Sequence, residues 1–146
     1  MQQHQLDRLA EELFAVVPQL HRLMDTGVRR EMGAETSAPQ LRLLSELQHG
    51  PQSMSALARQ LHVSPQAISD LIHDLEERGW LARSPHPRDR RQQLLALTTD
   101  GAAAFAQARA RALGQLTPLL GLLSEAELSV VAAALPALNR VLNQAE

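Results

Sequence analysis

Residues 53–98 decide the fold of this chain, and they read SMSALARQLHVSPQAISDLIHDLEERGWLARSPHPRDRRQQLLALT. The first part of this segment predicts a short helix that begins after Ser53, whose hydroxyl can cap the unpaired backbone N–H groups. The apolar side chains of that helix share one stripe, which comprises Met54, Leu57, Ala58 and Leu61. This spacing is typical of an amphipathic helix that packs on a core.

A second helix is predicted after a tight turn, with Ser64 as its N-cap and Pro65 at its first helical position. Its apolar residues follow the i, i+3, i+4, i+7 spacing of an inward face, and they are Ile68, Leu71, Ile72 and Leu75. Two short helices joined by about three residues form a helix-turn-helix, whose second helix can lie in the major groove of DNA.

Short apolar runs at Leu81 and at 94–97 flank an arginine-rich loop, which predicts a β-hairpin wing. From Arg78 to Arg91 the chain carries five arginines and a single acid, Asp89, although its formal net charge is −2. For binding to nucleic acid, the distribution of charge matters more than the total. A helix-turn-helix followed by a basic hairpin therefore predicts a winged DNA-binding module.

Length and composition bound the other possibilities. The 146 residues suffice for one domain with a core, and their helical periodicity predicts a mainly α fold with a small β-hairpin wing. There is no cysteine, which excludes disulfides, thiolate metal ligands and thiol redox switches. The N-terminus lacks the layout of a signal peptide, and no apolar run approaches the roughly 18 residues of a membrane span. We therefore expect a soluble cytoplasmic protein that contacts no membrane.

Helices are also predicted before and after this module. The first covers about 6–32, with a local kink at Pro18. The next begins at Thr36 or Ser37 and ends near Gln48, and it is expected to bury Leu41, Leu44 and Leu47.

Two more helices are predicted after the wing. Thr98 is expected to cap a helix over about 99–116, which Pro118 should interrupt. The Ser-x-x-Glu pattern at Ser124 predicts a capping box for a last helix that ends near Asn143.

These terminal helices carry more apolar side chains than one chain can cover. The residues concerned are Leu113, Leu116, Leu119, Leu120, Leu122, Leu123, Leu128, Val131, Leu135, Leu138 and Leu142. They could form an intramolecular core, but we favour a homodimer in which both chain ends intertwine with a second copy. The sequence is thus divided into a DNA-binding lobe at 37–98 and a helical dimerisation region at 1–36 and 99–146.

The order of short motifs resembles the MarR family of winged-helix regulators over nearly the whole chain. The resemblance rests on Gln40, Leu43-Leu44, Leu57-Ala58, Val63-Ser64, Leu75-Glu76, Gly79-Trp80-Leu81, Arg83, Asp89-Arg90-Arg91, Leu97-Thr98 and Gly101. It implies a triangular dimer that binds a pseudo-palindromic operator in double-stranded DNA and represses transcription by occluding a promoter. It also implies release by a small aromatic or phenolic anion bound between the dimerisation base and the lobes.

Two residues depart from the family pattern. His62 stands in the turn where glycine is common, so its backbone is expected to have a positive φ at some cost in strain. Asp70 stands where the family usually has a basic residue, and Asp74, Glu76 and Glu77 follow it. Acids that face phosphates lower affinity for DNA. A winged-helix protein-interaction module that has lost DNA binding is therefore the alternative function.

Six residues at the start of the second helix of the helix-turn-helix are candidate DNA contacts: Ser64, Pro65, Gln66, Ser69, Asp70 and His73. Gln66 can pair bidentately with adenine, Ser69 can contact several base edges, and Asp70 can accept from cytosine N4. The alternative is a solvated face that contacts only water.

In the wing, Asp89 and Arg91 are two residues apart, which on an extended backbone places them on the same side. A carboxylate there can orient a guanidinium toward a narrow minor groove, which matches the Asp-x-Arg pattern of the family. Arg88 and Arg90 are expected to meet phosphates. The alternative is a mobile, solvated loop.

Other kinds of site find little support in the sequence. No two of the six histidines stand at i, i+3 or i+4, and no catalytic constellation is evident, so we expect neither an enzyme nor a metal or other cofactor. Trp80 is expected to belong to the core. The family resemblance implies an effector pocket between the first two helices and the lobe, near His21, Arg22 and the start of the long fifth helix.

Overall fold

A computed structural model describes residues 2–33 and 36–144 of the chain. The elements in chain order are α1 (Gln2–Met32), α2 (Ala38–Leu47), β1 (Gln52–Ser53), α3 (Met54–Gln60), α4 (Pro65–Glu77), β2 (Leu81–Pro85), β3 (Gln93–Leu97), α5 (Thr99–Leu120) and α6 (Glu125–Gln144). The mainly helical winged fold that the sequence predicts is confirmed.

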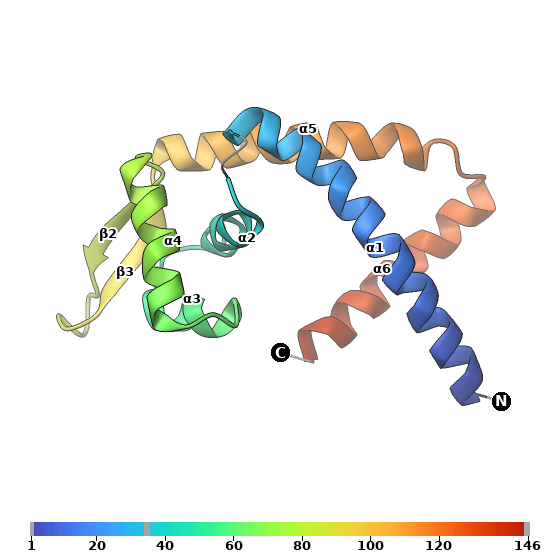
Figure 1. The fold of residues 1–146 in the computed structure, drawn as a ribbon, viewed down its shortest axis with the longest axis horizontal. Coiled ribbons are helices and arrows are strands. Elements are labelled where there is room, and N and C mark those ends of the chain that lie inside the picture. Colours follow the sequence, from blue (N-terminus) through green and yellow to red (C-terminus); the bar gives the residue numbers. More distant parts are fainter. Residues whose placement is uncertain (1, 34–35, 145–146) are drawn as a thin grey trace.

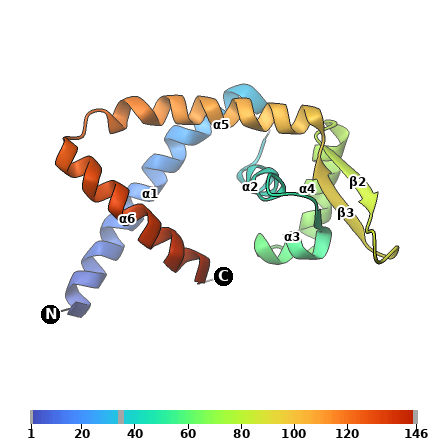
Figure 2. The same cartoon turned by 180° about the vertical axis from the view of Figure 1, so that it is seen from behind.

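The long helix α5 connects two parts of the molecule (Figure 1). A lobe made of α2, α3, α4 and the sheet lies below the end at which α5 begins, α6 turns back from the other end of α5, and the N-terminal half of α1 extends away from α5 on the side remote from the lobe. The view from behind shows the same separation (Figure 2). None of the helices in the described residues is long and apolar enough to cross a membrane.

Side-chain caps start the helices where the sequence places them. Ser37 is the N-cap of α2 and forms a capping box with Gln40, and Ser53, Ser64 and Thr98 cap α3, α4 and α5. Each hydroxyl accepts a hydrogen bond from a backbone N–H that has no partner within its helix. Each such cap stabilises the fold by about 1 kcal/mol.

The predicted capping box before α6 is also present. The Ser124 backbone N–H donates to Oε2 of Glu127 at 2.8 Å, and the Glu127 N–H donates to Oγ of Ser124 at 3.3 Å. The Ser124 hydroxyl also donates to Oε2 of Glu127, at 2.7 Å, and the two hydrogen bonds from Ser124 to this oxygen stabilise the ionised carboxylate and therefore lower the pKa of Glu127.

The wing is a three-stranded antiparallel sheet in the order β1-β3-β2. The hairpin of β2 and β3 pairs Leu81 with Leu97 and Pro85 with Gln93. The third strand, β1, pairs Gln52 with Leu95. This strand was not predicted, because two residues are too short to show the alternation of a strand.

The core lies within the lobe. Its largest fully buried side chains come from α2, α3, α4 and β3, and they include Leu43, Leu44, Leu57, Ile68, Ile72, Leu75 and Leu95. The predicted stripe of α4 is confirmed, although Leu71 is only partly buried. Burial of each of these aliphatic side chains stabilises the fold by about 1.5–3 kcal/mol. That energy holds α4 against α3 and the sheet.

Two predictions about the core were wrong in detail. On α2 the buried residues are Gln40, Leu43, Leu44 and Leu47, while Leu41 is only partly buried, because it lines a cavity between α1, α2 and α5. Met54 remains exposed, since it is the first residue of α3 and lies at the edge of the lobe.

The prediction that helix α5 ends before Pro118 was wrong. The helix continues to Leu120, and Gly121 N–H donates to Thr117 O at 3.0 Å. A proline removes only its own N–H from the ladder, and here it does so within the last turn, where little helix remains to be disrupted.

Candidate nucleic-acid interface

The turn between α3 and α4 has the geometry expected of a helix-turn-helix. His62 has a φ of 52°, which confirms the positive φ expected at this position. The turn closes with the Val63 N–H, which donates to Ala58 O at 3.0 Å. This left-handed residue allows the chain to reverse within a few residues, and it thereby determines how α4 is presented.

The predicted reading residues lie together on the first turns of α4, on the side opposite its buried stripe. Ser64, Pro65, Gln66, Asp70 and His73 are exposed, and Ser69 is partly buried. The start of α4 and the tip of the wing both lie at the end of the lobe remote from α5 (Figures 1 and 2). One surface therefore presents both elements.

The acids of α4 have partners, which the sequence analysis did not anticipate. Gln66 Nε2 donates to Asp70 Oδ1 at 3.0 Å, and His73 Nε2 lies 3.3 Å from Glu77 Oε1. Further from the exposed face, Gln40 Nε2 donates to Asp74 Oδ2 at 3.4 Å.

The most extensive of these pairs joins α4 to the wing. Arg83 donates from Nε and Nη2 to the two carboxylate oxygens of Glu76, at 2.6 and 3.0 Å. The hydrogen bond to Glu76 raises the pKa of Arg83. Bidentate pairs of this kind hold both groups in one orientation. Arg83 thus neutralises Glu76, so the acidity of α4 is a weaker obstacle to DNA than its composition indicates.

The tip of the wing is a turn, whereas the sequence analysis expected an extended backbone. Asp89 Oδ1 accepts the backbone N–H of Arg91 at 3.0 Å, and Gln92 N–H donates to Asp89 O at 3.0 Å. The predicted carboxylate–guanidinium clamp is therefore wrong. In this Asx turn the Asp89 carboxylate accepts from the Arg91 backbone N–H and from Nε2 of Gln92, rather than from the Arg91 guanidinium.

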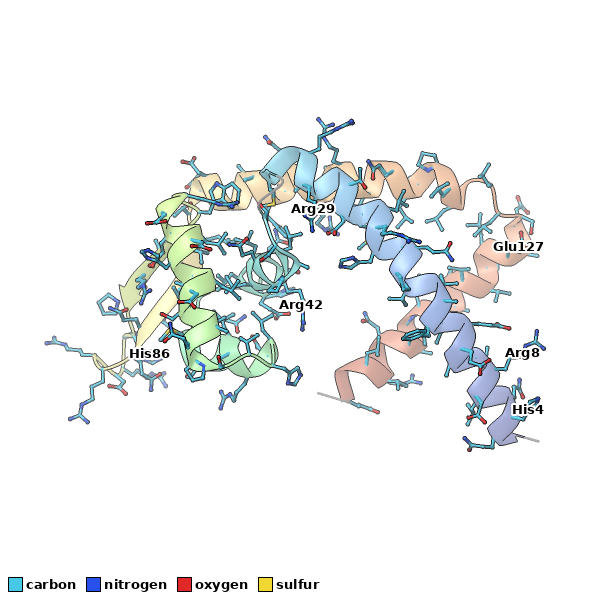
Figure 3. The ribbon with its side chains drawn as sticks, viewed as in Figure 1. His4, Arg8, Arg29, Arg42, His86 and Glu127 are labelled. Carbon is cyan, nitrogen blue, oxygen red and sulfur yellow. The ribbon has the colours of Figure 1, made fainter. Side chains whose placement is uncertain are left out.

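His86 organises the other side of the same tip. Its Nδ1 accepts the backbone N–H groups of Arg88 and Asp89, each at 3.2 Å, and it stands at the wing (Figure 3). Arg88, Arg90 and Arg91 are exposed at this tip. This role of His86 was not predicted, because an isolated histidine shows no pattern in the sequence that indicates which backbone groups it will meet.

A cavity of about 460 Å³ lies where α1, α2 and α5 meet. Its walls are largely apolar, with Met24, Val28, Leu41, Phe105, Leu113 and Leu116 among the lining residues. His21 lines the cavity as expected, but Arg22 does not, because it lies one residue further around α1 and is exposed. The arginines of the cavity are Arg42 and Arg109, and Arg42 projects from α2 on the side away from the wing (Figure 3).

The chain was compared with known proteins. The model of the MarR family matches residues 36–92. An HTH-type transcriptional regulator of Mycobacterium bovis, Mb0904, is 30% identical over 128 residues, which cover 87% of each protein. Such relatives are regulators and not enzymes, as the sequence analysis expected.

Solved structures show the same fold. The crystal structure of RV1404 from Mycobacterium tuberculosis has a TM-score of 0.81 and 26% identity, with 92% of each chain covered. FabT of Streptococcus pneumoniae, in complex with DNA, has a TM-score of 0.79 and 18% identity, with coverage of 97% of this chain and 99% of that one. The family match, the relative and the shared fold agree with the helix-turn-helix and wing described above, and the chain belongs to the MarR family of transcriptional regulators.

Proposed function

We propose that this regulator is a sequence-specific repressor that binds a pseudo-palindromic operator as a homodimer and responds to a small aromatic anion. The observation that carries the DNA-binding part is the surface on which the exposed start of α4 and the arginine-bearing wing tip lie together. A helix of this kind fits the major groove, and an arginine on a wing fits the narrower minor groove.

Each candidate residue apart from Asp70 has a part in this proposal. Gln66 and Ser69 read base edges in the major groove, with Ser64 and Pro65 at the phosphate-facing start of α4 and His73 one turn further on. Arg91 enters the minor groove. Asp89 supports it indirectly, through the turn that sets its backbone. Arg88 and Arg90 contact phosphates on either side.

A homodimer is supported by apolar faces that the described chain leaves partly exposed. On α6 a stripe with alternating spacings of three and four residues is substantially exposed, and it comprises Leu128, Val131, Leu135, Leu138 and Leu142. A second exposed stripe on α1 includes Leu6, Leu9, Leu13 and Leu20. Such spacing is typical of helices that pack against another helix along a continuous seam. A second copy would cover these faces and set two α4 helices about 34–36 Å apart, one turn of DNA.

The cavity between α1, α2 and α5 supports response to an effector. Its apolar walls suit an aromatic ring, and Arg42 and Arg109 suit a carboxylate or phenolate. Because the cavity lies between the lobe and the helices that would form the dimer, a ligand there can alter the spacing of the two lobes. It acts by preferring one spacing, so DNA and ligand weaken each other by the same factor.

The test is a mobility-shift titration on DNA from upstream of the gene itself, repeated at several salt concentrations. We expect a shifted complex whose affinity falls steeply with salt, since counterions are released when arginines meet phosphates. A protein that shifts no DNA at low salt would instead be the interaction module that is the alternative function.

A further inference from the structure

Gln66 and Asp70 form a pair at the centre of the exposed face of α4. The side chains are one helical turn apart, both are exposed, and Nε2 of Gln66 donates to Oδ1 of Asp70 at 3.0 Å. Ile68 and Ile72, which alternate with them, are fully buried and anchor this stretch of helix. The pair thus stands on a rigid support and faces outward.

The chemistry of the two groups determines which atoms Gln66 can offer. An ionised carboxylate only accepts hydrogen bonds, whereas an amide has an acceptor oxygen and a nitrogen with two hydrogens. Asp70 therefore requires the nitrogen of Gln66 to face it, and it takes one of the two hydrogens. The outer edge of the amide retains one acceptor, Oε1, beside one remaining N–H donor.

That edge matches one base. In the major groove adenine presents an acceptor, N7, beside the donor N6–H₂, while guanine presents two acceptors, N7 and O6. Guanine could satisfy both acceptors only by taking both amide hydrogens, and Asp70 already holds one of them. The Asp70 carboxylate would also repel the O6 and N7 atoms of guanine.

We propose that Gln66 and Asp70 act as one adenine-selective reading unit, in which Gln66 contacts the base and Asp70 is the positioning residue that sets the orientation of the amide. This inference rests on the proposed DNA-binding function and deepens it. It gives Asp70 a role that a basic residue at this position could not have, since a cation would accept nothing from the amide.

Neighbouring groups leave the pair intact. On the same face the imidazole of His73 lies beside Glu77, at 3.3 Å, rather than beside Asp70. The other acids of α4, Asp74 and Glu76, are engaged by Gln40 and Arg83. Glu77 is therefore a suitable control for a change in charge, because it is exposed on the same helix and pairs with a different residue.

The experiment selects binding sites from a library of double-stranded DNA with the full-length protein. The variants are Asp70→Asn, Gln66→Ala and the double variant, with Glu77→Gln as the control that removes the same charge. Circular dichroism and gel filtration establish that each variant retains the helical content and size of the parent. The readout is the ratio of A·T to G·C at each position of the half-site.

We expect the parent to prefer adenine over guanine by roughly tenfold or more at one base pair of each half-site. Asp70→Asn should bring that ratio close to one. An asparagine side chain can donate as well as accept, so it no longer fixes the orientation of the Gln66 amide. Glu77→Gln should strengthen binding to all sequences alike and leave the ratio unchanged. In the Gln66→Ala background, Asp70→Asn should have no further effect on that base pair.

Three results would overturn the inference. A change of base preference by Asp70→Asn that persists in the Gln66→Ala background would mean that Asp70 reads a base directly. An unchanged preference in both single variants would mean that the pair reads nothing. If the parent selects no sequence at all, the proposed function itself fails, and the inference fails with it.

Discussion

Arg78, at the end of α4, donates from Nη1 to the hydroxyl of Thr36 at 2.8 Å. Thr36 is fully buried, and its hydroxyl in turn donates to Met32 O, the last residue of α1, at 2.7 Å. Arg78 also lies over the ring of Trp80, 5.1 Å from its centroid. The end of the candidate reading helix is thus joined to the end of α1 through one buried hydroxyl.

We expect Thr36→Val to destabilise the fold by about 1–3 kcal/mol, because valine keeps the shape but removes the buried hydroxyl that accepts from Arg78 and donates to Met32 O. The matched control is Thr117→Val, since the Thr117 hydroxyl makes the same kind of bond, to Leu113 O at 2.9 Å, but is exposed. Urea denaturation measures both. Equal midpoints for the two variants would show that the Thr36 bonds contribute nothing specific.

Gly101 provides a second stability test. A Cβ at residue 101 would overlap the backbone carbonyl of Trp80, whereas nothing lies within 4 Å of a Cβ at Gly114 in the same helix. Gly101→Ala should destabilise by about 2 kcal/mol or more, as overpacking against backbone requires the chain to shift. Gly114→Ala should stabilise by about 0.5–1 kcal/mol. Thermal unfolding of both variants checks the opposite signs.

In the wing, Arg91→Ala should weaken operator binding by about 1–3 kcal/mol without affecting folding. Asp89→Ala should cause most of the same loss, because it removes the acceptor for the Arg91 backbone N–H. Asp89→Asn is the matched variant, since an asparagine oxygen can accept that bond. The measurement is fluorescence anisotropy on operator DNA. Parental affinity in both Arg91→Ala and Asp89→Ala would mean that the wing is a solvated loop.

The apolar stripe of α6 predicts which substitutions separate a dimer. Leu135 lies on the stripe and is 58% exposed in the single chain, whereas Ala133 lies on the opposite face of the helix by its position in the sequence. Leu135→Glu should raise the dimer dissociation constant strongly or cause aggregation, while Ala133→Glu should not. Sedimentation velocity distinguishes these states. A dimer of unchanged strength in Leu135→Glu would argue against this interface.

Release from DNA should follow addition of an aromatic acid. Millimolar salicylate or benzoate should dissociate the operator complex, and Arg42→Ala should reduce that response because Arg42 lines the cavity. Arg22→Ala serves as the control, since Arg22 is exposed outside it. Peroxide should have little effect, because the chain has no cysteine to oxidise. Dissociation by mild peroxide but by neither acid would contradict this prediction.

Much of the fold could be predicted from the sequence, because the features concerned involve residues close together in the chain. These features depend on contacts within one or two turns of the chain. They are the caps at Ser53, Ser64 and Thr98, the buried stripe of α4 and the positive φ of His62. Such short-range preferences act whatever the rest of the molecule does. They place the candidate reading residues on α4 and the arginines in the wing.

The tertiary structure alone decided which distant groups meet. Four features depend on how the elements pack. They are the face that α2 buries, the pairing of β1 with β3, the Arg83–Glu76 pair, and the position of Arg42 rather than Arg22 at the cavity. Periodicity shows that a helix has an apolar face but not which neighbour that face meets or how far it is turned. The sequence by itself therefore determined the helices, the wing hairpin, their order and the residues of the candidate reading surface. Packing determined which charges on that surface are neutralised, because a pair such as Arg83 and Glu76 exists only where two elements are brought together.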